Sequence, residues 1–157
     1  MLIRIMVVLN VILLGFIWGY PAVHYAELPE IIPSHFRGDG TPDGFGSKSL
    51  IWLEAGMATV LFGICCWMYA QPSRINLPED FKKSPEAVRR FIALFCTLVM
   101  LIFAWIGYTT IETALGRGAQ ITLAPGMVIG LMFVSIIGLL IYLGKANESP
   151  NRKDIQN

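Results

Sequence analysis

The sequence predicts an all-α integral membrane protein with four transmembrane helices and an ordered extracytoplasmic loop between the first two. Hydrophobic residues make up 55% of the 157 residues and charged residues only 15%, whereas soluble domains carry about 25% charged residues. A membrane helix needs about 20 mostly apolar residues, and four segments qualify: residues 2–22, 50–69, 88–112 and 123–143. We therefore expect one membrane domain over residues 1–157, with an outer loop at 23–49, a cytoplasmic loop at 70–87 and a cytoplasmic tail at 144–157.

Capping residues predict the ends of the third helix. Ser84 followed by Pro85 is typical of a helix N-terminus, because proline is tolerated at the first helical position. Glycine often ends a helix by adopting a left-handed conformation, so we expect the helix to end at Gly116 or Gly118. The helix is therefore expected to extend beyond its membrane span at both ends.

Basic residues predict the orientation of the chain. Nine of the twelve Lys and Arg residues lie near the N-terminus, in or beside the 70–87 loop, or after residue 143. Membrane proteins carry an excess of Lys and Arg on the cytoplasmic side. Both termini are therefore expected in the cytoplasm, and the 23–49 loop is expected outside.

The outer loop contains the sequence LPEIIPSHFRGDGTPDGFGSK at residues 28–48. Its proline and glycine positions predict tight turns at Asp39-Gly40 and at 41–44, and Ser47 is expected to cap the second helix. Four apolar side chains lie among these turn residues, at Ile31, Ile32, Phe36 and Phe45. A flexible linker would not need them, so the loop is predicted to form an ordered cap on the outer end of the bundle.

The same loop holds most of the candidate functional residues, and three roles are open for it: a structural cap, a recognition surface or a metal site. The residues proposed to make recognition contacts or to hold their geometry are Pro29, Glu30, Pro33, His35, Phe36, Arg37, Asp39, Gly40, Asp43, Gly44 and Lys48. The metal candidates are His35, Asp39 and Asp43, because zinc and calcium bind combinations of His and carboxylate ligands. Their spacing matches no established metal-binding loop.

Two polar residues within the predicted spans form a candidate intramembrane site. Asn10 is expected to make an interhelical hydrogen bond. Glu54 lies about one turn into the second span, and a carboxylate there usually faces a partner, a cavity or the interface. It either reaches the outer surface or the outer loop, or it binds a cation or a proton.

Several functional classes are disfavoured by the sequence. It contains no G-x-S-x-G, P-loop or H-E-x-x-H motif, so we predict no catalytic residues, no enzymatic activity and no cofactor. The net charge of +1 and the lack of a basic stripe argue against a nucleic-acid partner. The three cysteines lie in apolar segments and match neither a disulfide framework nor a zinc pattern.

The loop motif resembles a bacterial membrane domain of unknown function. The residues that carry the resemblance are Leu28-Pro29, Ile32-Pro33, His35-Phe36, Gly40, Asp43-Gly44 and Ser47-Lys48, after a first transmembrane helix. A similar pattern occurs in proteins like the sporulation-delaying-toxin immunity protein. The resemblance covers the first span, the loop and the start of the second span. It implies a location in the bacterial inner (plasma) membrane.

From these observations we expect a non-enzymatic inner-membrane protein whose outer loop is a recognition surface or a structural cap. Its expected partners are the lipid bilayer and either a peptide toxin or another membrane protein. Two alternatives stay open. The chain could be an accessory subunit of a larger membrane complex, or a small metal- or ion-binding membrane protein that uses His35, Asp39, Asp43 and Glu54.

Overall fold

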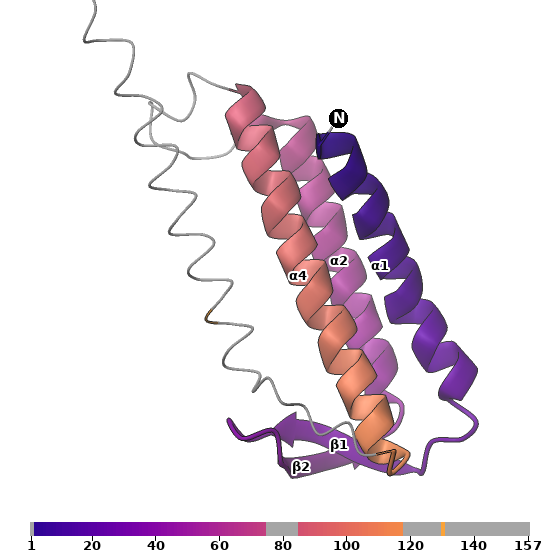
Figure 1. Cartoon of the computed structure of the whole chain (residues 1–157). Helices are drawn as coiled ribbons and strands as arrows, with labels where there is room; N and C mark the ends of the chain where they lie inside the picture. The colour runs from indigo at the N-terminus through magenta and orange to yellow at the C-terminus, as the bar shows by residue number, and fades with distance from the viewer. Residues whose placement is uncertain (1, 75–84, 118–129, 131–157) are drawn as a thin grey trace, which may run out of the picture.

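In a computed structural model of the chain, three long helices lie side by side and a β-hairpin crosses one end of the bundle (Figure 1). The structure describes residues 2–74, 85–117 and 130. The helices are α1 (Leu2–His24), α2 (Leu50–Ala70) and α4 (Pro85–Ala114), with the short 3-10 helix η1 (Pro72–Arg74) after α2. The hairpin strands are β1 (Ile31–Phe36) and β2 (Pro42–Ser47).

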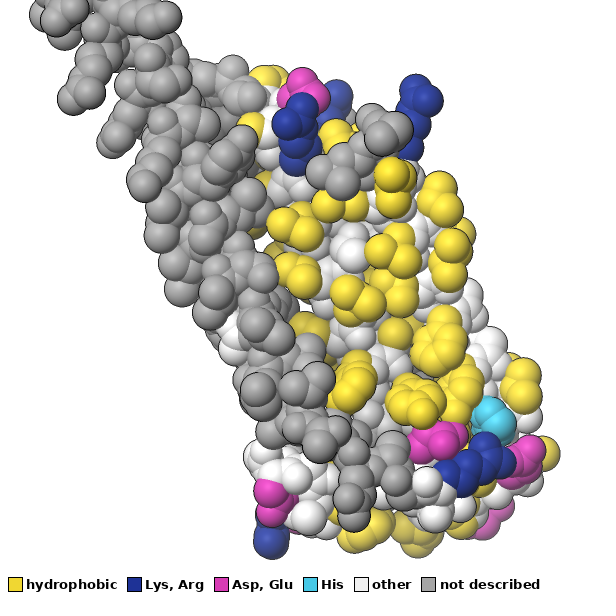
Figure 2. All heavy atoms as spheres, viewed as in Figure 1, with side chains coloured by type: hydrophobic (Ala, Val, Ile, Leu, Met, Phe, Trp, Pro, Cys, Tyr) yellow, Lys and Arg dark blue, Asp and Glu magenta, His cyan; other side chains and the backbone are white. Residues whose placement is uncertain are grey.

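All three long helices are apolar and long enough to cross a bilayer. Figure 2 shows hydrophobic side chains over the middle of the described surface, with charged side chains gathered towards its two ends. The helices predicted to span the membrane at 2–22, 50–69 and 88–112 are therefore confirmed as helices, and the chain has the features of a multi-pass membrane protein. The predicted span at 123–143, Gly130 excepted, and the predicted tail at 144–157 lie outside the described residues.

The loop between α1 and α2 is ordered, but it contains a two-stranded antiparallel sheet. The all-α prediction is therefore wrong for this segment. Ile31 pairs with Ser47 at the base of the hairpin, and Phe36 pairs with Pro42 near its tip. Proline is accepted in β2 because both strands of a two-stranded sheet are edge strands, where a missing N–H costs little.

The chain reverses at Gly38–Gly40, between the two strands. The Arg37 N–H donates a hydrogen bond of 2.8 Å to the Thr41 carbonyl, and Gly40 adopts a φ of +84°. The turn predicted at Asp39-Gly40 is therefore confirmed, whereas residues 42–44 of the second predicted turn belong to β2. Asp43-Gly44 has the composition of a turn, but here both residues lie in β2, where Gly44 pairs with His35.

Helix α2 begins at Leu50, where the predicted span begins, but its N-cap differs from the predicted one. Its N-cap is Ser49, and the predicted cap, Ser47, is the last residue of β2. The Ser47 hydroxyl lies 3.0 Å from the Ser49 hydroxyl. Because strand pairing extends to Ser47, the helix starts only after a two-residue turn.

Helix α4 ends as the capping residues predicted, with Gly116 at φ +66°. The Gly116 N–H donates to the Thr113 carbonyl at 3.1 Å, and the Arg117 N–H donates to the Glu112 carbonyl at 3.0 Å. These two hydrogen bonds define a Schellman motif. The motif brings Arg117 back beside Glu112, where their side chains form an ion pair.

Two apolar clusters hold the bundle together. The larger lies between the helices and consists of Ile17, Ala55, Ala58, Cys65, Cys96, Met100 and Ala104. The smaller joins the hairpin to the helix ends and consists of Leu28, Ile32, Ile51 and Ile111. Ile32 is only 1% exposed, and burying such a side chain contributes about 1.5–3 kcal/mol. The predicted cap on the bundle is therefore confirmed.

Candidate functional site

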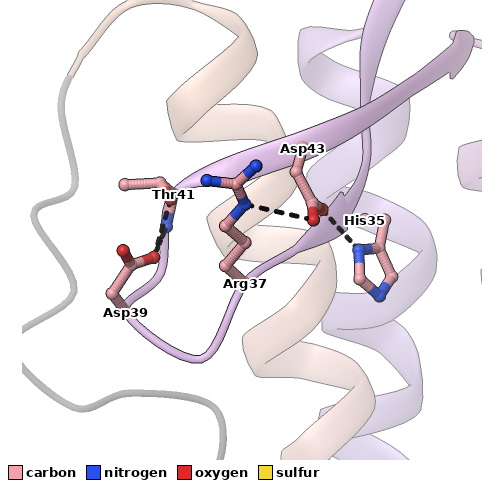
Figure 3. A network of polar contacts seen from close by, with 5 residues as sticks. All are labelled: His35, Arg37, Asp39, Thr41 and Asp43. Carbon is pink, nitrogen blue, oxygen red and sulfur yellow. Dashed lines mark hydrogen bonds and ion pairs between the residues drawn. The ribbon is translucent and has the colours of Figure 1, made fainter.

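A cluster of three charged or titratable side chains lies on the exposed surface of the hairpin, with Asp43 at its centre (Figure 3). His35 Nδ1 donates to Asp43 Oδ1 at 2.5 Å, and Arg37 Nε donates to Asp43 Oδ2 at 3.4 Å. The hydrogen bond from His35, with a smaller contribution from Arg37, holds the pKa of Asp43 below its ordinary value. Both oxygens of the Asp43 carboxylate are therefore oriented by neighbours on β1 and the turn.

The backbone of the hairpin places His35 in this cluster. The strand register is irregular between Pro33 and His35 and again between His35 and Phe36. Gly44 is the cross-strand partner of His35, and a Cβ atom at position 44 would lie only 2.9 Å from the His35 Cβ. Glycine at position 44 therefore allows the two strands to approach closely where His35 reaches Asp43.

Asp39 is separated from this cluster at the tip of the hairpin (Figure 3). Its Oδ1 accepts hydrogen bonds from the Thr41 N–H at 2.9 Å and from the Thr41 hydroxyl at 2.7 Å. These hydrogen bonds lower the pKa of Asp39. The structure thus brings together two of the three metal candidates, His35 and Asp43. Within residues 2–74 and 85–117, no three His, Cys, Asp or Glu side chains gather as metal ligands do.

Two further motif residues fasten the base of the hairpin. The Lys48 ammonium lies 3.0 Å from the Glu30 carboxylate and 5.1 Å from the centre of the Tyr25 ring. The Lys48 N–H also donates to the Glu30 carbonyl at 3.0 Å. Only 18% of the Lys48 side chain is exposed, so its contacts in this structure are structural.

The other motif residues shape the hairpin. Pro33 is buried and pairs with Phe45, and Phe36 is half-buried opposite Pro42. Pro29 is exposed in the segment before β1. Gly40 supplies the positive φ of the turn, because glycine adopts this conformation without steric strain.

Glu54 lies on α2, at the end of the bundle that carries the hairpin, and it faces α4. A Cβ atom at Gly107 would lie 3.3 Å from Glu54 Oε1, which has no hydrogen-bond partner among the described residues. The side chain borders a cavity of about 10 Å³ between α1, α2 and α4, which is about the size needed for one water molecule. Glu54 also borders a cavity of about 420 Å³ together with Ile32, Pro33 and Ser34 of the hairpin. The roles expected for Glu54, at the outer surface or loop or with a cation or proton, stay predictions.

Asn10 lies in the opposite half of the bundle, so it does not form one site with Glu54. Its side chain is buried, with 3% of the residue exposed. Its Oδ1 atom has no partner within the described part of the chain. The expected interhelical hydrogen bond to this oxygen is therefore not formed there.

The sequence did not predict a polar network that joins the ends of α1 and α4 next to the hairpin. Tyr20 donates to Glu112 at 2.5 Å, and Arg117 donates to Glu27 at 2.8 Å. Arg117 also lies 3.6 Å from Glu112. The opposite charges of Glu27, Glu112 and Arg117 near predicted helix ends were the available signal, but sequence separations of about 90 residues hid the pairing.

Comparison with known proteins identifies the segment around this site. Residues 12–59 match a domain of unknown function, DUF1648. The match spans the second half of α1, the whole hairpin and the first half of α2. It therefore supports the part of the resemblance that concerns a domain of unknown function.

An archaeal relative is similar to part of this chain. An uncharacterized protein from the archaeon Archaeoglobus fulgidus is 48% identical over 40 residues, which cover 26% of this chain and 22% of the relative. No solved structure matches the chain. Since the relative is archaeal, the bacterial setting and the toxin-immunity link stay predictions.

Proposed function

We propose that this chain is a non-enzymatic membrane protein that recognises a peptide or another membrane protein through its hairpin. The observation that carries the proposal is the orientation of Asp43 by His35 and Arg37 on an exposed surface. The side chains of His35 and Arg37 are 72% and 67% exposed. Both side chains are accessible to a partner although their positions are already constrained.

Exposed apolar side chains elsewhere on the hairpin support the proposal. Ile31 and Phe45 are 65% and 63% exposed on the same hairpin, although both are large and hydrophobic. Protein interfaces combine apolar anchors at their centre with polar groups around them. The hairpin offers both on a base that Ile32 and Lys48 fasten to the bundle, so little ordering would accompany binding.

The polar contacts of His35 favour binding over catalysis. His35 is hydrogen-bonded to Asp43, and in the described part of the chain no Ser, Thr or Cys side chain bonds to its ring. A catalytic triad requires such a nucleophile on the other ring nitrogen. A non-enzymatic role therefore fits this arrangement better.

The proposed location is the bacterial inner membrane, with both termini in the cytoplasm and the hairpin outside. Arg4, Arg74, Arg89 and Arg90 belong to the helix ends opposite the hairpin. An excess of basic residues marks the cytoplasmic side. In this orientation the hairpin meets molecules that arrive from outside the cell, as an immunity protein for a peptide toxin requires.

Survival of toxin-sensitive cells tests this proposal. Bacteria that are sensitive to the sporulation-delaying toxin would express the wild-type chain, the double variant His35→Ala/Asp43→Ala or the control Val60→Ala. Val60 is 63% exposed in the middle of α2, away from the hairpin. We expect protection by the wild type and the control, and loss of protection by the double variant at equal membrane abundance.

Each contrary outcome removes a different part of the proposal. If the wild-type chain gives no protection, the immunity role is wrong. If the double variant protects as well as the wild type, the charged cluster does not make the recognition contact. If the double variant disappears from the membrane, His35 and Asp43 serve the fold rather than recognition.

A further inference from the structure

A second candidate site lies between the hairpin, α2 and α4, and it is independent of the recognition function proposed for the exposed cluster. It is the cavity of about 420 Å³ that Glu54 borders together with residues of β1. Most of the side chains that line it are hydrophobic, and Glu54 is the one charged side chain among the described residues of its lining. The cavity thus combines a large apolar space with a single negative charge.

One wall of this cavity is continuous with the outer surface of the bundle. Leu53 and Met57 on α2 and Ile106 on α4 line the cavity, yet they are 59%, 48% and 41% exposed. Both helices are long and apolar enough to cross a bilayer, so exposed apolar side chains on them meet lipid. The cavity is therefore open to the hydrocarbon chains of the bilayer.

The Glu54 carboxylate has no cationic partner within residues 2–74 and 85–117. Its Oε1 atom is enclosed beside Gly107 without a hydrogen bond, so an occupant of the cavity does not reach this oxygen. The residue as a whole is only half-buried, which leaves Oε2 as the oxygen that an occupant can contact. Carboxylates in membrane segments usually face a partner or a cavity, because an isolated charge there is costly. A cationic group in the cavity would supply this partner.

The rest of the lining determines the kind of cation. A metal ion such as zinc or calcium takes four or more ligands, and the described lining contains one carboxylate and neither His nor Cys. An organic ammonium group needs fewer contacts, because each N–H can donate a charge-assisted hydrogen bond to a carboxylate. The exposed apolar wall fits a hydrocarbon chain attached to such a group. The lining therefore favours an amphiphile with an ammonium head.

We propose that this cavity binds the headgroup of phosphatidylethanolamine from the surrounding bilayer. The primary ammonium group donates to Glu54 Oε2, and one acyl chain lies along Leu53, Met57 and Ile106. Ser34 is exposed and lines the same cavity, so its hydroxyl can donate to the lipid phosphate. A choline headgroup has the same charge but no N–H donor, and phosphatidylglycerol brings a negative charge towards Glu54. The cavity therefore selects ethanolamine lipids over these two.

Native mass spectrometry of the full-length protein measures this selectivity. Protein in detergent, freed of lipid, would be titrated with phosphatidylethanolamine, phosphatidylcholine or phosphatidylglycerol that carry identical oleoyl chains. We expect the ethanolamine lipid to bind with a dissociation constant about tenfold lower than that of either other lipid. Glu54→Gln keeps the shape of the side chain but removes its charge, so it should remove this preference. Glu86→Gln is the control and should keep it, because Glu86 is 70% exposed at the opposite end of the bundle.

A variant that fills the cavity separates this site from lipid bound elsewhere on the helices. Ile106→Trp places a large ring in the cavity that Ile106 lines, so it should also remove the preference for the ethanolamine lipid. If wild-type protein binds ethanolamine and choline lipids equally, the proposal is wrong. It is also wrong if Glu54→Gln or Ile106→Trp keeps the preference, or if Glu86→Gln loses it. The wild-type comparison decides the question even if a variant fails to fold.

Discussion

Tyr20 on α1 donates a hydrogen bond of 2.5 Å to Glu112 on α4, across a separation of 92 residues in the sequence. The Schellman motif at the end of α4 brings Arg117 to the same place, where it pairs with both Glu112 and Glu27. The ends of two membrane helices are thus joined directly beneath the hairpin. This connection gives the hairpin a fixed base.

The first prediction concerns this connection. Tyr20→Phe keeps the ring stacked on Phe16 but removes the hydroxyl that Glu112 accepts from. A hydrogen bond to a charged group contributes about 1.5–3 kcal/mol, so the free energy of unfolding in detergent should fall by about that amount. Tyr25→Phe is the matched control and should change little, because the contacts of Tyr25 with Trp52 and Lys48 involve its ring. Equal stability of the two variants would contradict the structural importance of the bond.

The second prediction uses two neighbouring isoleucines with opposite environments. Ile32 is 1% exposed and joins the hairpin to the helices, whereas Ile31 is 65% exposed. Ile32→Ala should lower the free energy of unfolding by about 2–5 kcal/mol, while Ile31→Ala should stay within about 0.5 kcal/mol of the wild type. Fluorescence of Trp52, which packs on the same cluster as Ile32, reports the loss of docking. A larger effect at Ile31 would mean that the hairpin is docked through its other face.

The third prediction concerns the hairpin turn. Gly40 has a φ of +84°, whereas no positive φ occurs at Gly38. An alanine in the left-handed conformation costs about 1–2 kcal/mol. Gly40→Ala should therefore destabilise the hairpin, and Gly38→Ala should not, because a Cβ atom there meets nothing within 4 Å. Amide hydrogen exchange of β1 and β2 measures the difference, and equal exchange in both variants would show that this turn conformation is not required.

The fourth prediction is a pH dependence. The hydrogen bond from His35 lowers the pKa of Asp43 in the folded protein. The contribution of this bond to stability is therefore fully present above the unfolded pKa of Asp, about 3.9, and is lost as the pH falls through the lower folded value. In His35→Ala the pKa of Asp43 should rise towards its ordinary value.

Carbon-13 NMR of the aspartate carboxyl groups checks this titration. Asp39 is an internal control, because its pKa is lowered mainly by Thr41 and not by His35. Its midpoint should stay the same in His35→Ala. An unchanged midpoint for Asp43 would show that His35 does not hold the carboxylate in solution.

The three described helices were predictable because their signals are local. Each of the three helices is a long apolar segment. In addition, Pro85 and Gly116 mark the two ends of α4. The strands were missed because Pro42, Gly44 and Gly46 usually mark turns, and only their pairing with β1 makes them strand residues.

The candidate site was predicted only in part. His35 and Asp43 were chosen as candidates because of the motif, but their contact depends on strand register. Lys48 was one of the motif residues expected to make recognition contacts or to hold their geometry, and in the structure it fastens the hairpin to Glu30 and Tyr25. Contacts between residues that are distant in sequence, such as Tyr20 with Glu112, follow from helix packing and not from any local pattern.

Photo-crosslinking at Phe45 tests recognition by the hairpin most directly. A photoreactive amino acid would replace Phe45, or Val60 as a lipid-facing control, in cells exposed to the toxin; both positions are 63% exposed. Recognition predicts a discrete toxin adduct at position 45 that is lost when Asp43→Ala is added, and no such adduct at position 60. Equal adducts at both positions, or an adduct at position 45 that is unchanged by Asp43→Ala, would contradict a recognition surface built around Asp43.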